Sequence, residues 1–144
     1  HCTNKQLYQA TALSYLICMY IKEYSGKLSA FCGCGIAAGT GMACGLVYLQ
    51  QGNKEQIDHV IRNMASSITG MICDGGNHGC VMKGMAAVDI AFESAQLAMA
   101  DVSIESVHGI NGMSIEDTLK NMGEIADPGM RETEKVIVDI LKKK

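Results

Sequence analysis

The stretch from Leu28 to Asn53 contains no formally charged side chain, although charged residues make up 19% of the whole chain. A segment of this length can either cross a bilayer or run through the middle of a globular core. It contains the pairs Gly35/Gly39 and Gly41/Gly45, and small residues at this spacing let two helices approach closely. No second segment of this kind accompanies it. We therefore interpret its part from about Ile36 to Gln51 as a buried, Gly/Ala-rich central helix, with a membrane span as the alternative.

Apolar residues recur at helical spacing through most of the chain, and no segment alternates convincingly with a period of two. Polar residues that can cap helix N-termini stand before several of these stretches: Asn4, Asn53 with Gln56, Ser114 with Asp117, and Asp127 before the only proline, Pro128. The pattern predicts an all-α fold, a compact bundle of about six helices. At 144 residues the chain is expected to form a single helical domain over residues 1–144.

Charge and cysteine content narrow the classes of function. The formal net charge is −3, so the chain has no basic footprint for nucleic acid and no polybasic patch for a membrane surface. Its seven cysteines do not form the regular ladder of a small disulfide-rich secreted domain, and no signal peptide is visible. This favours a cytoplasmic protein whose clustered thiols hold a metal or perform chemistry.

The cysteines fall into two groups. Three lie inside or beside helical patterns and are interpreted as small packing residues: Cys2, Cys18 and Cys44. Four lie in glycine-rich segments without periodicity: Cys32, Cys34, Cys73 and Cys80. Glycine lets a backbone turn sharply and come close to a metal cluster. The C-x6-C spacing of the last two matches neither a zinc knuckle nor a ferredoxin, so these residues predict a metal site without naming the metal. A set of buried, inert thiols is the alternative.

Two segments resemble the L-cysteine desulfidase family, which is related to the α-chain domain of iron–sulfur L-serine dehydratases. They are GKLSAFCGCGIAAGTG at residues 26–41 and ITGMICDGGNHGCVMK at residues 68–83, the second preceded by Asn63-Met64. The similarity runs from about Leu13 to Leu141. It implies an all-helical domain that binds a [4Fe–4S] cluster.

The resemblance also implies the ligands. The run Cys34-Gly-Ile-Ala-Ala-Gly39 matches the first cluster cysteine of the serine dehydratase branch better than Cys32 does. The ligand role is therefore carried to Cys34, Cys73 and Cys80, with Cys32 as the fallback for Cys34. Three protein ligands leave one iron open as a Lewis acid. The implied reaction is β-elimination from L-cysteine to pyruvate, ammonia and sulfide, or from L-serine to pyruvate and ammonia. The C-x6-C spacing tilts this choice toward cysteine.

Other polar residues are given simpler interpretations. His78 is expected to be a solvated loop residue, and His59 and His108 surface residues. Lys83 is interpreted as a charge on a helix surface, with contact to a substrate carboxylate as the alternative. No residue is a convincing general base. Family members are longer and carry an N-terminal region that is absent here, so we expect the chain to be a C-terminal fragment, inactive alone, whose partner is that region. A homo-oligomer is compatible with the sequence. The alternative function is a non-catalytic helical metal-binding or interaction module.

Overall fold

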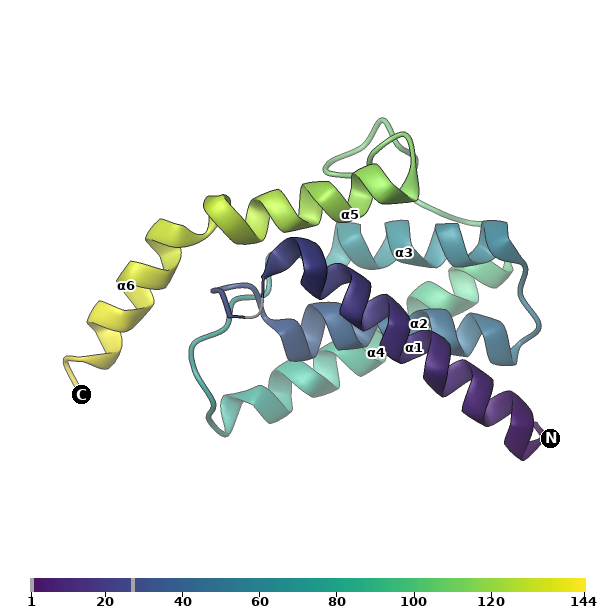
Figure 1. Cartoon of the computed structure of the whole chain (residues 1–144), viewed down its shortest axis with the longest axis horizontal. Coiled ribbons are helices and arrows are strands. Elements are labelled where there is room, and N and C mark those ends of the chain that lie inside the picture. Colours follow the sequence, from purple (N-terminus) through teal and green to yellow (C-terminus); the bar gives the residue numbers. More distant parts are fainter. Residues whose placement is uncertain (1, 27) are drawn as a thin grey trace.

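The computed structural model describes residues 2–26 and 28–144 and confirms the predicted all-α bundle (Figure 1). Six α-helices and two π-helical turns follow one another along the chain. Their bounds are α1 Asn4–Ser25, η1 Gly33–Ala37, α2 Ala38–Leu49, α3 Lys54–Ile68, α4 Gly79–Met99, α5 Ile115–Glu124, η2 Ile125–Gly129 and α6 Arg131–Leu141. Within the described residues, no helix is long and apolar enough to cross a membrane.

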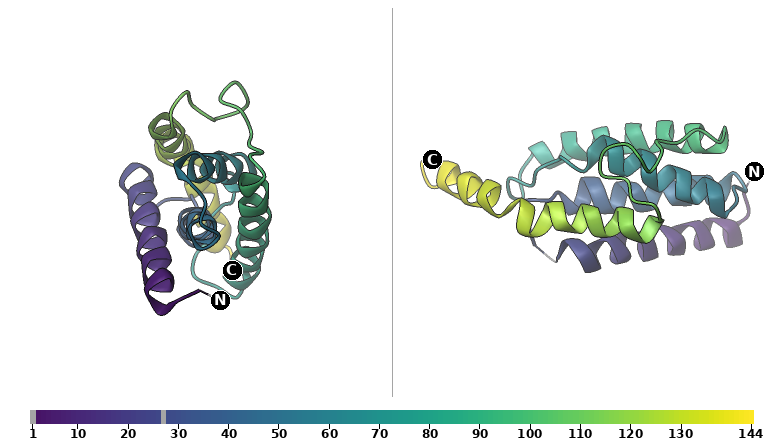
Figure 2. Two further views of the ribbon diagram at one scale, coloured as in Figure 1. Left: turned by 90° about the vertical axis from the view of Figure 1, so that its right-hand side faces the viewer. Right: turned by 90° about the horizontal axis from the view of Figure 1, so that it is seen from above.

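Helix α2 is the centre of the bundle, as the uncharged stretch predicts. It packs against α1, α3 and α4, and the end-on view in Figure 2 shows these three helices arranged around it. Most of its residues are buried: Gly39, Thr40, Gly41, Ala43, Cys44, Gly45 and Val47. A helix that is enclosed on several sides needs small residues, because each neighbour must approach its backbone closely.

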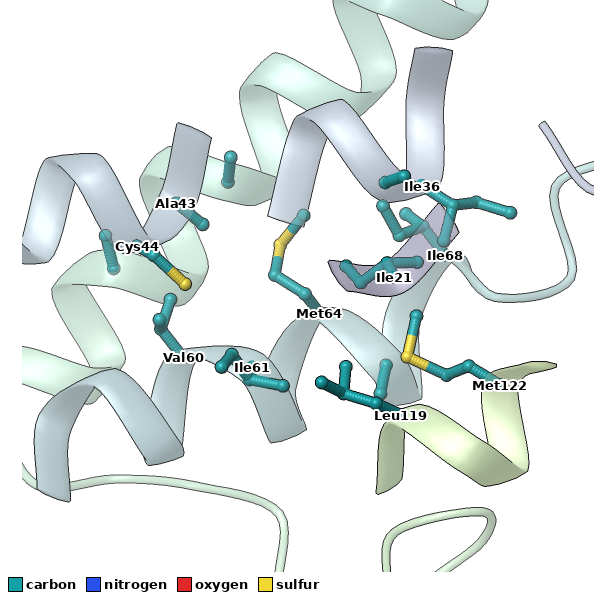
Figure 3. Packing of buried hydrophobic residues seen from close by; sticks show 14 of the residues in the cluster. Ile21, Ile36, Ala43, Cys44, Val60, Ile61, Met64, Ile68, Leu119 and Met122 are labelled. Carbon is teal, nitrogen blue, oxygen red and sulfur yellow. The ribbon is translucent and has the colours of Figure 1, made fainter. Parts of the chain in front are cut away.

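The apolar core is built from aliphatic side chains and methionine. Val60, Ile61 and Met64 project from α3 toward α2, and Leu119 and Met122 reach the same core from α5 (Figure 3). All five are at most 2% exposed. The apolar face of α3 therefore packs against the centre of the bundle.

The helix starts follow local capping signals, except at the first and last helices. The Asn53/Gln56 and Ser114/Asp117 capping boxes are both formed. At the first helix the cap is Thr3, whose hydroxyl accepts a hydrogen bond from the Gln6 backbone N–H, so Asn4 is the first helical residue. Both residues are good caps, and the glutamine that completes the box stands three residues after the threonine.

The last helix begins later than expected. Asp127 does not cap it. Its carboxylate instead accepts a hydrogen bond from Arg131 Nε at 2.6 Å, and α6 starts at Arg131. Helix α6 has no buried residue and extends away from the bundle (Figure 1). It therefore adds nothing to the core.

Candidate functional site

The two glycine-rich cysteine segments are joined by backbone hydrogen bonds. The Cys32 N–H donates to the Met71 carbonyl at 3.0 Å, and the Cys73 N–H donates to the Ala30 carbonyl at 2.6 Å. These bonds form an isolated antiparallel bridge between segments that lie about forty residues apart. The bridge, the turn η1 and the start of α4 lie at the same end of the bundle (Figure 1). The structure thus brings together the segments that the sequence marks.

Cys32, which precedes turn η1, and Cys34, which lies within it, have different roles. Cys32 is 4% exposed, and its sulfur accepts a hydrogen bond from the Gly35 N–H at 3.4 Å. Cys34 is exposed. A Cβ on Gly35 would lie 2.3 Å from the Met71 sulfur, so a side chain there would displace the Met71 thioether from its contact with the turn. Cys32 is therefore an N-cap for the turn, whereas the Cys34 thiol is accessible to a ligand.

A hollow of about 400 Å³ lies beside this turn, and we call it the thiol hollow. Its lining includes Cys18, Lys22, Gly33, Cys34, Ala38 and Cys73. Two of the three predicted ligands, Cys34 and Cys73, therefore share one cavity. Helix α1 forms its other wall, because Cys18 and Lys22 stand one helical turn apart and face the same side.

Of the three cysteines interpreted as packing residues, only Cys2 contradicts the prediction, whereas Cys18 packs against the core and also lines the thiol hollow. Cys18 is half-buried in the thiol hollow, and Cys2 is exposed before α1. Burial raises the pKa of the Cys18 thiol, and the Lys22 ammonium acts in the opposite direction. Cys44 is a packing residue as predicted, because it is fully buried in α2 and burial raises its pKa to about 12.

Cys80 lies in the first turn of α4 and does not line the thiol hollow. Its thiol donates to the Gly75 carbonyl at 3.4 Å. Within residues 2–26 and 28–144, no three His, Cys, Asp or Glu side chains are grouped closely enough to hold a single metal ion. The structure therefore pairs Cys34 with Cys73 and places Cys80 in the adjoining first turn of α4.

The donor chemistry fits an iron–sulfur cluster better than a single ion. Thiolates are the protein ligands of such clusters, and three thiols lie on the two bridged segments and the helix that follows them. A four-iron cluster is larger than one ion, so its ligands need not converge as closely. The glycines of the loop, Gly75 and Gly76, have no neighbour within 4 Å of where a Cβ would be, which leaves backbone room beside Cys80.

Lys83 is tied to the cysteine loop. Its ammonium contacts the Asp74 carboxylate, and its side chain is only 20% exposed. The interaction lowers the pKa of Asp74 and raises the pKa of Lys83. The expected simple surface charge is therefore wrong, since this residue anchors the loop to α4.

The histidines are placed partly as expected. His78 and His108 are exposed. His59 is half-buried, and its Nδ1 atom has no hydrogen-bond partner within the described chain. The surface interpretation is therefore wrong for His59.

Comparisons with known proteins show the family to which the chain belongs. The model of the serine dehydratase alpha chain family matches residues 1–139, and the chain belongs to that family. A UPF0597 protein of Clostridium botulinum is 54% identical over 96% of this chain. UPF0597 proteins of Caldanaerobacter subterraneus and Clostridioides difficile are 43% and 40% identical over 98% and 96% of it. No solved structure matches significantly.

The chain spans about a third of the length of these relatives, 32% to 33%. The resemblance found in the sequence is thus confirmed at the level of the family.

Lys22 is the residue of the thiol hollow that sequence reasoning missed. Its spacing of four residues from Cys18 was a usable signal, since side chains at this spacing share a helix face. This spacing points to Lys22 only when Cys18 is taken as a site residue, and the sequence pattern favours a packing role for Cys18.

Proposed function

We propose that this chain is the iron–sulfur-binding domain of a lyase that catalyses β-elimination from L-cysteine or L-serine. One observation carries the proposal. Cys34 and Cys73, far apart in sequence, line one hollow that is held in place by backbone hydrogen bonds between their segments. Membership of the serine dehydratase alpha chain family supports the same class of reaction.

Cys34, Cys73 and Cys80 would hold the [4Fe–4S] cluster. The accessible thiol of Cys34 favours it over Cys32, whose sulfur is buried and already accepts the Gly35 N–H. When bound, the cluster would supply a Lewis acid for the departing thiol or hydroxyl group. The chain's own part is to hold three thiolates and to keep the surrounding wall apolar, as Ala38 and Phe31 do in the thiol hollow.

L-Cysteine is the substrate that we favour. The C-x6-C spacing of Cys73 and Cys80 resembles the desulfidase branch of the family. A comparison of pyruvate formed from L-cysteine and from L-serine by the longer protein tests the choice. Faster release from serine would reverse it.

The remaining two-thirds of the longer protein is the partner that we propose for the outer faces of α1 and α4. Each helix exposes a stripe of large apolar residues at helical spacing. These residues are Tyr8, Tyr15 and Met19 on α1 and Met82, Met85 and Phe92 on α4, each more than half exposed. Exposed patches of this kind mark interaction surfaces. The partner would also supply the general base.

Separate expression of the two parts tests this partner. A tagged N-terminal part should capture the chain, and Tyr15→Glu or Met85→Glu should weaken capture at least tenfold. Val107→Glu is the matched control, because Val107 is equally exposed but lies on a loop. Capture that is unaffected by both α1 and α4 variants would contradict the proposed surface.

Anaerobic reconstitution with iron and sulfide tests the cluster. We expect broad visible absorption that oxygen bleaches, with iron and sulfide retained after desalting. Cys73→Ala should lose both, and Cys2→Ala should retain them, since Cys2 is exposed away from the thiol hollow. Equal iron in the two variants would refute the site. Iron retention without pyruvate release by the longer protein would favour the non-catalytic metal-binding module.

A further inference from the structure

Lys22 places a positive charge in the thiol hollow. A Cβ on Gly33 would lie 3.4 Å from Lys22 Nζ, so the ammonium rests against the turn that carries Cys34. The lysine side chain also covers one wall of the hollow, since two of its aliphatic carbons lie within 3.8 Å of the position that a Cβ on Gly33 would occupy.

The charge of Lys22 is not neutralised by a protein carboxylate. The ion pairs of the described residues involve Lys54, Lys83, Lys120, Arg131, Lys135 and Lys142, and no described carboxylate lies within 4.0 Å of the Lys22 ammonium. Among the described residues that line the hollow, Lys22 is the single cation, beside thiols, small residues and apolar side chains. An anionic group entering the hollow would therefore meet one site of opposite charge.

We propose that Lys22 binds the carboxylate of the amino-acid substrate in the thiol hollow. This inference rests on the proposed function, because it assigns a substrate group to the same site. A volume of about 400 Å³ is ample for a small amino acid. A carboxylate held at Lys22 would bring the substrate's β-substituent toward Cys34 and Cys73, while the lysine offsets repulsion between the carboxylate and the thiolates.

Alkylation of Cys34 by two reagents tests the proposal on the protein without iron. Iodoacetate and iodoacetamide react identically: the thiolate sulfur attacks the methylene carbon, an S–C bond forms, the C–I bond breaks and iodide leaves. Only iodoacetate carries a carboxylate. Both reagents attack the same thiolate, so the ratio of their rates removes any change in the thiolate fraction and reports the preference for a carboxylate.

Mass spectrometry of the peptides gives this ratio for Cys34 and, as an internal reference, for exposed Cys2. We expect the ratio at Cys34 to exceed that at Cys2 by about fivefold, the size of a partly exposed charge interaction. Lys22→Met should abolish the excess, and Lys22→Arg should retain it. Lys5→Met is the matched control on the same helix and should leave the Cys34 ratio unchanged.

An unchanged Cys34 ratio in Lys22→Met would overturn the inference, as would an equal fall in Lys5→Met. The outcome is separable from that of the proposed function. Reconstitution of the wild-type chain decides whether the thiols bind iron, and the alkylation ratio decides whether Lys22 attracts a carboxylate, so either can fail alone.

Discussion

Gly41 of α2 lies directly against the main chain of α1 at Ser14. A Cβ at Gly41 would lie 2.3 Å from the Ser14 carbonyl oxygen, and one turn later a Cβ at Gly45 would lie 3.1 Å from the Ala10 carbonyl oxygen. Gly41 and Gly45 are one of the two glycine pairs, four residues apart, that the uncharged stretch contains. This contact fixes how closely α2 packs against α1, the helix that supplies Cys18 and Lys22 to the thiol hollow.

Gly41→Ala should destabilise the fold by about 1–3 kcal/mol, since the added methyl group must displace backbone atoms of α1. Gly84→Ala is the matched control, because Gly84 lies within α4 with nothing within 4 Å of its Cβ position. That change should stabilise by about 0.5–1 kcal/mol through helix propensity. Urea unfolding measures both. Equal effects of the two changes would mean that the helices do not pack this closely.

Glu116 links α5 to α1 by accepting hydrogen bonds from the hydroxyls of Tyr20 and Tyr24. These bonds lower the pKa of Glu116 below its ordinary value of 4.5, and they raise the pKa of Tyr24. The carboxylate therefore contributes stability at neutral pH, and this contribution is lost as the pH falls through the lowered pKa.

Glu116→Gln should lower the melting temperature at pH 7, and the difference from wild type should shrink below pH 4.5. Thermal unfolding followed by circular dichroism across this range gives the comparison. Glu124→Gln on the same helix serves as the control, because Glu124 is exposed. A difference that persists undiminished at acid pH would contradict the role of the charged carboxylate.

Cys34→Ala and Cys32→Ala should have opposite consequences. The first should abolish retention of reconstituted iron with little effect on stability, because Cys34 is exposed. The second should keep iron but cost about 1 kcal/mol, because the buried Cys32 sulfur caps the turn. Iron analysis and urea unfolding of both variants give the answer. Loss of iron in Cys32→Ala alone would instead make Cys32 the first ligand.

Asn63 holds the segment 101–113 against α3. Its amide donates to the Val102 carbonyl and accepts from the Ile104 N–H, both at 3.0 Å. Asn63→Ala should cost about 1–3 kcal/mol, because a buried backbone donor and acceptor lose their partner. Hydrogen exchange of the Ile104 amide should become faster. Ser67→Ala, which removes only bonds to its own helix, should leave that amide protected.

Local signals account for much of the fold. Capping residues such as Asn53 and Ser114 act within one helical turn, so their effect can be found in the sequence. The four-residue spacing of the glycines in α2 can also be found in the sequence, and it indicates that another helix packs closely against α2. The prediction that Asp127 caps the last helix is wrong because its carboxylate accepts a hydrogen bond from the Arg131 side chain instead.

The candidate site could be predicted only in part. The residue pattern alone is enough to predict that the chain is helical, that α2 is central, and that Cys34 and Cys73 lie in segments able to bend toward a ligand. The packed fold was needed to show that Cys18 and Lys22 line the same hollow as those two thiols and that Cys80 does not. The reason is geometric: which side of α1 meets α2 depends on the crossing at Gly41, a long-range contact that no local pattern specifies.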